Sequence, residues 1–234
     1  MNEKIRKSVL VVDDVPLMCQ ILRDSFGDCA ERADCPYEFE VYEARSAAEC
    51  VENIRARGPK ADRPPYDVIV LDVRMEGERS GLDTAFVLAL YEELGVDRPV
   101  QIVFTGYPSY ANCIEAMRYG AWDYIVKEDV GEIGMAQVVV NSAVTRLRQL
   151  DHRREQETLI GSEWLPLNIL DLQANYEGKL VAIWDAPQIS VIASGQDAFE
   201  LEAGLKDWRR EHESWQQPFV VQVPPRHDES NEEN

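Results

Sequence analysis

The sequence predicts an α/β protein that consists of a doubly wound, five-stranded parallel sheet followed by a small α+β module. Short apolar runs bounded by turn signals alternate with longer stretches of helical spacing, which is typical of a parallel sheet covered on both faces by crossover helices. After residue 158 the pattern changes to alternating polar and apolar residues, which is typical of antiparallel strands. A chain of 234 residues with 45% hydrophobic residues can bury one full core and a smaller second one.

Five apolar runs are the predicted strands of the parallel sheet: residues 9–12, 39–42, 67–71, 100–104 and 124–126. Stretches of helical spacing between and after them predict helices after Pro16 and over residues 47–56, 82–94 and 110–118, with a fifth helix starting near Ile133. Pro16 suits the first turn of the first helix, because that turn needs no backbone donor. Gly58 and Pro59 end the second helix, because this pair favours a turn.

The fifth helix is predicted to extend beyond the sheet. Its apolar residues step by four and three positions, and they are Ala136, Val140, Ala143, Leu147 and Leu150. The part up to Ala143 suits the sheet-facing stripe of an ordinary amphipathic helix. Leu147 and Leu150 stand among arginines, which favours a linker helix that also contacts a partner chain. We therefore expect residues 133–158 to form the fifth helix and this linker.

The residues from 160 to 225 predict a small β-β-α-β module. Its strands alternate polar and apolar residues, and they are residues 176–184, 189–194 and 219–223. The helix between the second and third strands carries an apolar stripe of Ala198, Leu201, Leu205 and Trp208. Residues 226–234 are polar and acidic, which predicts a disordered tail.

The composition argues against several classes of protein. The formal net charge is −19, with 24 Lys and Arg against 43 Asp and Glu, and it disfavours contact with phosphate backbones, so we expect no direct nucleic-acid binding. The first apolar run, residues 9–12, is too short for a signal-peptide core or a membrane span, so we expect a cytoplasmic protein without membrane contact. Five cysteines without Cys-x-x-Cys spacing favour reduced thiols over a disulfide framework or a zinc site.

Polar residues come directly after four of the predicted strands, and they are Asp13, Asp14, Asp72, Thr105 and Lys127. Because the carboxyl ends of parallel strands meet at one edge of the sheet, where such folds bind ligands, we expect these side chains to form one site. Three clustered carboxylates repel one another unless a cation is present, and Mg²⁺ prefers such oxygen ligands. Each residue also has an ordinary explanation when taken alone. Asp13 or Asp14, for example, could cap the helix that starts at Pro16.

Four segments resemble, in this order, the signature segments of response-regulator receiver domains: Leu10–Asp14, Val68–Met75, Val103–Gly106 and Ala121–Lys127. The resemblance covers about residues 7–150. It implies a flavodoxin-like sheet with strand order 2-1-3-4-5 and a receiver core over residues 7–132. It also implies the response regulator of a phosphorelay, a signalling protein that slowly hydrolyses its own aspartyl phosphate and is not a turnover enzyme.

The resemblance assigns a role to each site residue. Asp72 corresponds to the phosphoacceptor, Lys127 to the cation that pairs with a phosphate oxygen, and both Thr105 and Tyr124 to the residues that switch on activation. The Mg²⁺ ligands correspond to Asp13, Asp14, Asp72 and the backbone carbonyl of Arg74. The implied partners are a cognate histidine kinase or phosphotransfer protein, a second copy bound through helices four and five, and an output protein that is reached by protein contacts.

Three details depart from the family pattern. Glu76 and Glu128 stand where proline is usual, and the loop over residues 77–81 looks about one residue longer than typical. Arg74 and Tyr107 lie two positions beyond the phosphoacceptor and the switch hydroxyl. Both side chains are large enough to screen a phosphoryl group from water, so we expect slow self-hydrolysis.

Two other interpretations compete with this one. Haloacid-dehalogenase-type phosphohydrolases use an Asp-x-Asp motif after the first strand, but here Asp14 is directly adjacent to Asp13 and position 15 is Val15. A receiver-like platform that binds partners without phosphorylation is the alternative, although the complete polar set favours phosphorylation. Segments within residues 176–224 resemble a small uncharacterised ββαβ family, which implies no chemistry and suits a signalling adaptor or a stabilising appendage.

Overall fold

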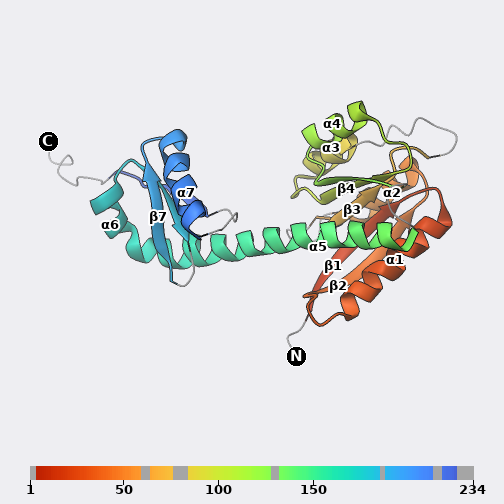
Figure 1. Ribbon diagram of the computed structural model, residues 1–234, viewed down its shortest axis with the longest axis horizontal. Helices are drawn as coiled ribbons and strands as arrows, with labels where there is room; N and C mark the ends of the chain where they lie inside the picture. The colour runs from red at the N-terminus through yellow and green to blue at the C-terminus, as the bar shows by residue number, and fades with distance from the viewer. Residues whose placement is uncertain are drawn as a thin grey trace. The chain divides into compact units, whose positions relative to one another are not determined.

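The computed structural model describes residues 4–58, 64–75, 84–127, 132–184, 188–212 and 218–225. These residues belong to two compact units, Met1–Arg148 and Gln149–Asn234 (Figure 1). The predicted acidic tail, the loop over residues 77–81, and the positions of Glu76 and Glu128 lie outside the described residues. Within them, no helix combines the length and the apolar composition needed to cross a bilayer.

The first unit contains a five-stranded sheet in which every pair of neighbouring strands is parallel. Its strands are β1 (Ile5–Val12), β2 (Tyr37–Ala44), β3 (Val68–Leu71), β4 (Val100–Thr105) and β5 (Asp123–Val126). Their order is β2-β1-β3-β4-β5, which confirms the predicted fold class. All residues of β3 and β4 are buried, as expected for central strands with both faces covered.

Helices cover both faces of this sheet, and they are α1 (Pro16–Glu31), α2 (Ala47–Arg57), α3 (Thr84–Leu94), α4 (Tyr110–Arg118) and α5 (Glu132–Gln156). One buried cluster joins Leu10 and Ile69 of the sheet to Ile54 of α2 and Leu90 of α3. The neighbouring residue Val9 is also fully buried, and it points to the opposite face, which α1 and α5 cover (Figure 1). Successive residues of β1 therefore contribute in turn to the apolar cores on the two faces of the sheet.

The buried apolar stripe of α5 extends further along the helix than the sequence analysis predicted. Ala143 is fully buried, and Leu147, which was expected to contact a partner chain, is buried within this chain at 3% exposure. The predicted partner contact of Leu147 is therefore wrong. This part of α5 belongs to the first unit, and the next residue, Arg148, donates from its guanidinium to the Asp34 carbonyl in the turn that follows α1. Leu150, one turn further on, is half-buried.

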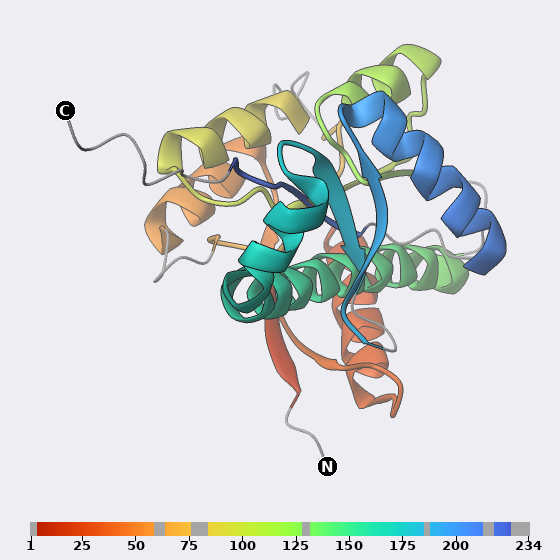
Figure 2. The ribbon, with the colours of Figure 1, turned by 90° about the vertical axis from the view of Figure 1, so that its left-hand side faces the viewer.

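The second unit is built on an antiparallel sheet of three strands, β6 (Leu180–Trp184), β7 (Ser190–Gly195) and β8 (Phe219–Gln222), in the order β7-β6-β8. One face packs on Ile160 and Leu172, from the helical segments η1 (Glu157–Trp164) and α6 (Leu165–Tyr176). The other face packs on Leu201 and Leu205 of α7 (Ala198–His212). Figure 2 shows the strands between α6 and α7. The predicted α+β module is thereby confirmed.

The helices η1 and α6 are the part of this unit that the sequence analysis missed. Tyr176 was expected to open a strand, but it ends α6, and the strand begins at Leu180 after a turn in which Gly178 has φ of 73°. The helical stripe was hidden because α6 carries leucines on both faces. Leu172 is buried, whereas Leu167 is 86% exposed, so the apolar residues show no clear period.

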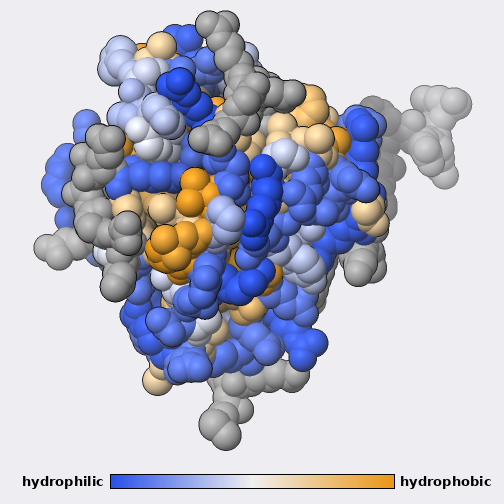
Figure 3. All heavy atoms as spheres, turned by 90° about the vertical axis from the view of Figure 1, so that its right-hand side faces the viewer, coloured by the Kyte–Doolittle hydropathy of each residue, from blue (hydrophilic) through white to orange (hydrophobic). Residues whose placement is uncertain are grey.

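Exposed apolar side chains occur on both units. On the one face that Figure 3 draws, apolar side chains form small patches among hydrophilic ones. The exposed large apolar side chains of α4 are Tyr110 and Met117, and the exposed Tyr119 follows directly after the helix. Scattered exposed apolar residues are normal, whereas several on one short helix indicate a contact surface. The five cysteines are free thiols, and all except Cys113 are buried.

The burial of Leu147 leads to a stability prediction. Replacing Leu147 by Ala should lower the free energy of unfolding by about 3 kcal/mol, because the truncation leaves a cavity in the core. Replacing the exposed Leu167 by Ala is the matched control and should change it by less than about 0.5 kcal/mol. Urea unfolding followed by circular dichroism measures both. Equal effects of the two substitutions would contradict the burial of Leu147.

Candidate functional site

The register of the sheet brings two of the predicted carboxylates together. Val12 of β1 pairs with Leu71 of β3, so the residues that follow them, Asp13 and Asp72, leave the sheet side by side. The Asp72 amide donates to the carbonyl of Val12 at 2.8 Å, which continues the ladder by one residue. With Asp14, these residues offer carboxylate oxygens that all lie within 4.8 Å of one another. The predicted acidic cluster is therefore present.

Backbone amides fix the direction of both buried carboxylates. Oδ1 of Asp13 accepts from the amide of Val15 at 2.9 Å, and Oδ1 of Asp72 accepts from the amide of Arg74 at 3.0 Å. The N-cap position of α1 is Val15, and it has no side-chain cap. The alternative in which Asp13 or Asp14 serves as the helix cap is therefore wrong, and the turn instead presents the Asp13 carboxylate to the site.

Lys127 joins the acidic cluster from the end of β5. Its amide donates to the carbonyl of Thr105 at 2.9 Å, and its Nζ lies 2.6 Å from Oδ2 of Asp13 and 2.6 Å from Oδ2 of Asp72. Only 13% of the Lys127 side chain is exposed, and the two carboxylate side chains are more deeply buried. The ammonium group therefore bridges two carboxylates where water screens little of their charge.

The electrostatics of this bridge keep Lys127 charged. Burial alone would lower the pKa of Lys127, but the hydrogen bonds to Asp13 and Asp72 outweigh it and raise the pKa above its ordinary value. Burial raises the pKa of Asp13, and the hydrogen bond from Lys127 offsets only part of that increase. Three ionised carboxylates with one ammonium leave two negative charges in the cluster.

This arrangement fits a Mg²⁺ ion. The ligands on offer are hard carboxylate oxygens from Asp13, Asp14 and Asp72, and a dication would balance the two residual charges. The hydrogen bonds from Lys127 and from the backbone occupy one direction on each oxygen. A carboxylate offers about four acceptor directions, so further directions remain for a metal. The donor set is therefore suitable without any rearrangement of Lys127.

Thr105 and Tyr124, the predicted switch residues, lie on the neighbouring strands β4 and β5. Oγ1 of the buried Thr105 accepts from the amide of Tyr107 at 3.1 Å, which leaves its hydroxyl hydrogen available as a donor. The Tyr124 ring packs on Val103 and Ala116. Its hydroxyl is buried without a hydrogen-bond partner among the described residues, and burial raises the pKa of Tyr124.

Arg74 and Tyr107 form a contact that the sequence analysis did not foresee. The Arg74 guanidinium carbon lies 4.1 Å from the centre of the Tyr107 ring, which is a cation–π contact. The only signal in the sequence was the equal spacing of two residues after Asp72 and after Thr105. The stacked pair therefore ties together the two loops that leave β3 and β4 at the site.

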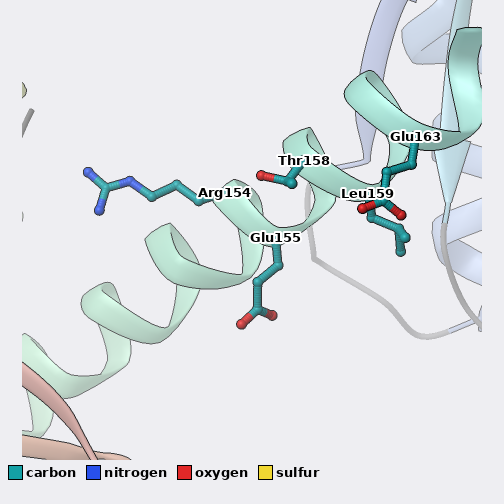
Figure 4. A pocket seen from close by; sticks show the side chains of 5 residues that line it. All are labelled: Arg154, Glu155, Thr158, Leu159 and Glu163. Atoms are coloured by element: carbon teal, nitrogen blue, oxygen red, sulfur yellow. The ribbon is translucent and has the colours of Figure 1, made fainter.

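A shallow hollow of about 340 Å³ in the second unit is a separate feature, lined by Arg154, Glu155, Thr158, Leu159 and Glu163. Figure 4 shows these side chains spread along one helical stretch, with Arg154 and Glu155 pointing in different directions. None of the predicted site residues lines it. The hollow brings no catalytic or ligand-binding set together, and we assign it no function.

The crowding of negative charge leads to a second prediction. In the presence of a chelator, replacing Asp13 by Asn should raise the free energy of unfolding at pH 7 by about 1 kcal/mol, because it removes one of three clustered charges. Because the pKa of Asp13 is raised in the folded protein, the wild type loses stability as the pH rises and Asp13 ionises. The stability gained by Asp13→Asn should therefore shrink as the pH falls and Asp13 of the wild type takes up a proton.

The exposed Asp24 on α1 supplies the matched control, since Asp24→Asn removes a charge outside the cluster. Denaturant unfolding at several pH values measures both variants. A loss of stability for Asp13→Asn under these conditions, with Asp24→Asn unchanged, would show that the three carboxylates do not repel one another.

Comparisons with known proteins agree with this geometry. The family model described as the response regulator receiver domain matches residues 9–137. Regulatory protein LuxO of Vibrio cholerae serotype O1 is 29% identical over 115 residues, which are 49% of this chain and 22% of that protein. This chain thus matches about a fifth of the length of that relative. The comparisons give no support to the resemblance of the second unit to a small ββαβ family.

Two solved receiver domains are similar to part of this chain. A response regulator receiver domain protein from Clostridium thermocellum has a TM-score of 0.44 and 22% identity, covering 62% of this chain and 98% of that one. The receiver domain of a putative LuxO repressor protein from Vibrio parahaemolyticus has a TM-score of 0.45 and 17% identity, covering 63% and 96%. The family match spans more than half of the residues, and the chain therefore belongs to the response regulator receiver domain family.

Proposed function

We propose that this chain is the response regulator of a phosphorelay, in which Asp72 accepts a phosphoryl group from a histidine kinase or a phosphotransfer protein. The observation that supports the proposal most is the contact of one ammonium, that of Lys127, with both Asp13 and Asp72 at 2.6 Å. A buried carboxylate beside two others and a fixed cation suits phosphoryl transfer, which depends mainly on positioning and on charge stabilisation.

In the proposed reaction, a carboxylate oxygen of Asp72 attacks the phosphorus of a phosphohistidine, and the bond from phosphorus to the imidazole nitrogen breaks. The Arg74 amide holds Oδ1 of Asp72, so the nucleophile enters the reaction already oriented. The Lys127 ammonium, which contacts Oδ2, would then pair with an oxygen of the incoming phosphoryl group. The leaving imidazole keeps the electron pair of the broken bond.

A Mg²⁺ ion would be held by Asp13, Asp14, Asp72 and the backbone carbonyl of Arg74. When bound, it would neutralise charge on the phosphoryl oxygens. The chain's own contribution is to hold these oxygens within 4.8 Å of one another and to keep the site shielded from bulk water.

Signalling would begin at Thr105. Its hydroxyl can donate to a phosphoryl oxygen on Asp72 while its Oγ1 still accepts from the Tyr107 amide. The movement of Thr105 would change the packing around Tyr124, whose hydroxyl has no hydrogen-bond partner among the residues that the structure describes. This change would bias the face formed by α4, β5 and α5. Exposed apolar residues on α4 suit a protein partner, either an output protein or a second copy, better than a nucleic acid.

The phosphorylated form should be long-lived, so the chain is a switch and not a turnover enzyme. The Arg74–Tyr107 contact joins the loops that follow Asp72 and Thr105, and it would hinder the approach of water to the aspartyl phosphate. The contact would leave the aspartyl phosphate chemically able to hydrolyse, and it would slow hydrolysis by reducing the access of the attacking water.

The central prediction concerns Asp72. Incubation with acetyl phosphate and Mg²⁺ should add one phosphoryl group to the wild-type chain, and the addition should be lost with a chelator and in Asp72→Asn. Asp24→Asn, the exposed aspartate on α1, is the matched control and should be labelled like the wild type. Intact-mass spectrometry measures the product. Normal labelling of Asp72→Asn would refute the proposal, and no labelling of any variant would favour the phosphorylation-independent platform.

A further prediction tests the screening of the phosphoryl group. Tyr107→Ala should shorten the lifetime of the phosphorylated form by about tenfold, which corresponds to about 1.4 kcal/mol of barrier, and Arg74→Ala should have a similar effect. Tyr110→Ala removes a more exposed tyrosine of the same region without this contact and should leave the lifetime unchanged. The decay of the phosphorylated mass after the phosphodonor is removed gives the rates. Unchanged decay in Tyr107→Ala would rule out the screening role.

A further inference from the structure

Two cysteine thiols are in contact at the corner between α1 and β2. Cys29 lies in the last turn of α1 and Cys35 lies two residues before β2, and their sulfur atoms are 3.5 Å apart. Both residues are buried, at 3% exposure each. No other pair among the described residues brings two free thiols into such contact. The contact is independent of the proposed phosphorylation site.

The backbone between these cysteines is compact. The Arg32 amide donates to the carbonyl of Cys29 at 3.2 Å, and the Cys35 amide donates to the carbonyl of Arg32 at 3.3 Å. These two bonds fold the intervening residues into a tight turn and bring the two side chains to the same point. A disulfide has its sulfur atoms about 2.05 Å apart, so closure needs an approach of roughly 1.5 Å, which small side-chain rotations can provide.

We propose that Cys29 and Cys35 form a reversible intramolecular disulfide when the protein meets a low-molecular-weight disulfide such as oxidised glutathione. The thiolate of one cysteine attacks the oxidant, which forms a mixed disulfide and releases one glutathione thiolate. The second cysteine, as thiolate, then displaces the other glutathione. The two cysteines lose two electrons and two protons in all, and the oxidant becomes two molecules of glutathione.

The surroundings of the pair determine how fast it reacts. Burial, the contact with Cys35 and the charge of Asp34 together raise the pKa of Cys29 to about 11, although Arg32 opposes part of the rise. Thiolate is the reactive species, so the reduced pair reacts slowly near neutral pH. The site therefore responds to sustained oxidation and not to a brief pulse.

The turn that the disulfide would lock is attached to two other parts of the first unit. The Lys4 ammonium donates to the carbonyls of Ala30 and Arg32, and the Arg148 guanidinium donates to the carbonyl of Asp34. Arg148 is the residue of α5 after which the second unit begins. Oxidation would thus fix the turn that anchors α5 at the point where it leaves the first unit.

Phosphorylation would be unaffected by this cross-link. Ile5 pairs with Tyr37 at the start of β1 and β2, so the cysteines lie near the amino ends of the strands. Asp72 follows the carboxyl end of β3. Labelling with acetyl phosphate is therefore a control for the integrity of the fold after oxidation, and it is not a readout of the disulfide.

The test uses the full chain, oxidised glutathione at pH 8.5, and tryptic digestion without a reductant. Trypsin cleaves after Arg32, between the two cysteines, so the disulfide should appear as residues 24–32 linked to residues 33–45. More than half of the chains should carry this link. The melting temperature of the oxidised protein should rise by about 5 °C, because the link restricts the unfolded chain, and a reductant should reverse it.

Matched variants decide the assignment. Cys35→Ser should abolish both the linked peptides and the shift in melting temperature, whereas Cys113→Ser, which removes the half-buried thiol of α4, should preserve both. Three outcomes would overturn the proposal: glutathione adducts without linked peptides, a link that forms only after the chain is unfolded in urea, or a link that lowers the melting temperature.

Discussion

The Lys127 ammonium and the two carboxylates that it contacts form the interaction on which the site depends. Neither Asp13 nor Asp72 is stable as an isolated buried charge, and Lys127 supplies a partner to both at 2.6 Å. The three charged residues follow strands β1, β3 and β5, which are far apart in the sequence. The ion pairs therefore form only when the parallel sheet has brought the ends of these strands together. The residual negative charge then makes the same cluster a suitable place for a divalent ion and a phosphoryl group.

The helix α5 belongs to both units, and this gives the chain a physical connection between them. Its residues up to Arg148 lie in the first unit, where Leu147 is buried and Arg148 binds the turn after α1. Its last residues lie in the second unit, where the His152 ring contacts Trp184 with centroids 6.3 Å apart and Gln156 is buried. The helix α5 therefore contributes buried residues to both units.

The two proposed controls would act at opposite ends of the strands of one sheet. Phosphorylation would act at the carboxyl ends of the strands, through Thr105 and Tyr124, and the thiol pair would act near the amino ends, through the turn that binds Arg148. The two proposals use different residues and different chemistry. Both proposals involve α5, because it is part of the face that includes α4 and β5 and because its residue Arg148 binds the turn between the two cysteines.

The pattern of residues by itself predicted the parallel sheet and the position of the polar residues at the strand ends, because buried strands appear as continuous apolar runs and their ends are where side chains become free to bind. The strand order followed from the resemblance of four segments to receiver domains. Only the tertiary structure decided what Leu147, Asp13 and Tyr107 contact, since these contacts join segments far apart in the chain. The tertiary structure also revealed the helices η1 and α6. Their apolar residues occur on both a buried and an exposed face, so the sequence shows no helical period of apolar residues there. Periodicity reports which face of a segment is apolar, and only packing determines what covers that face.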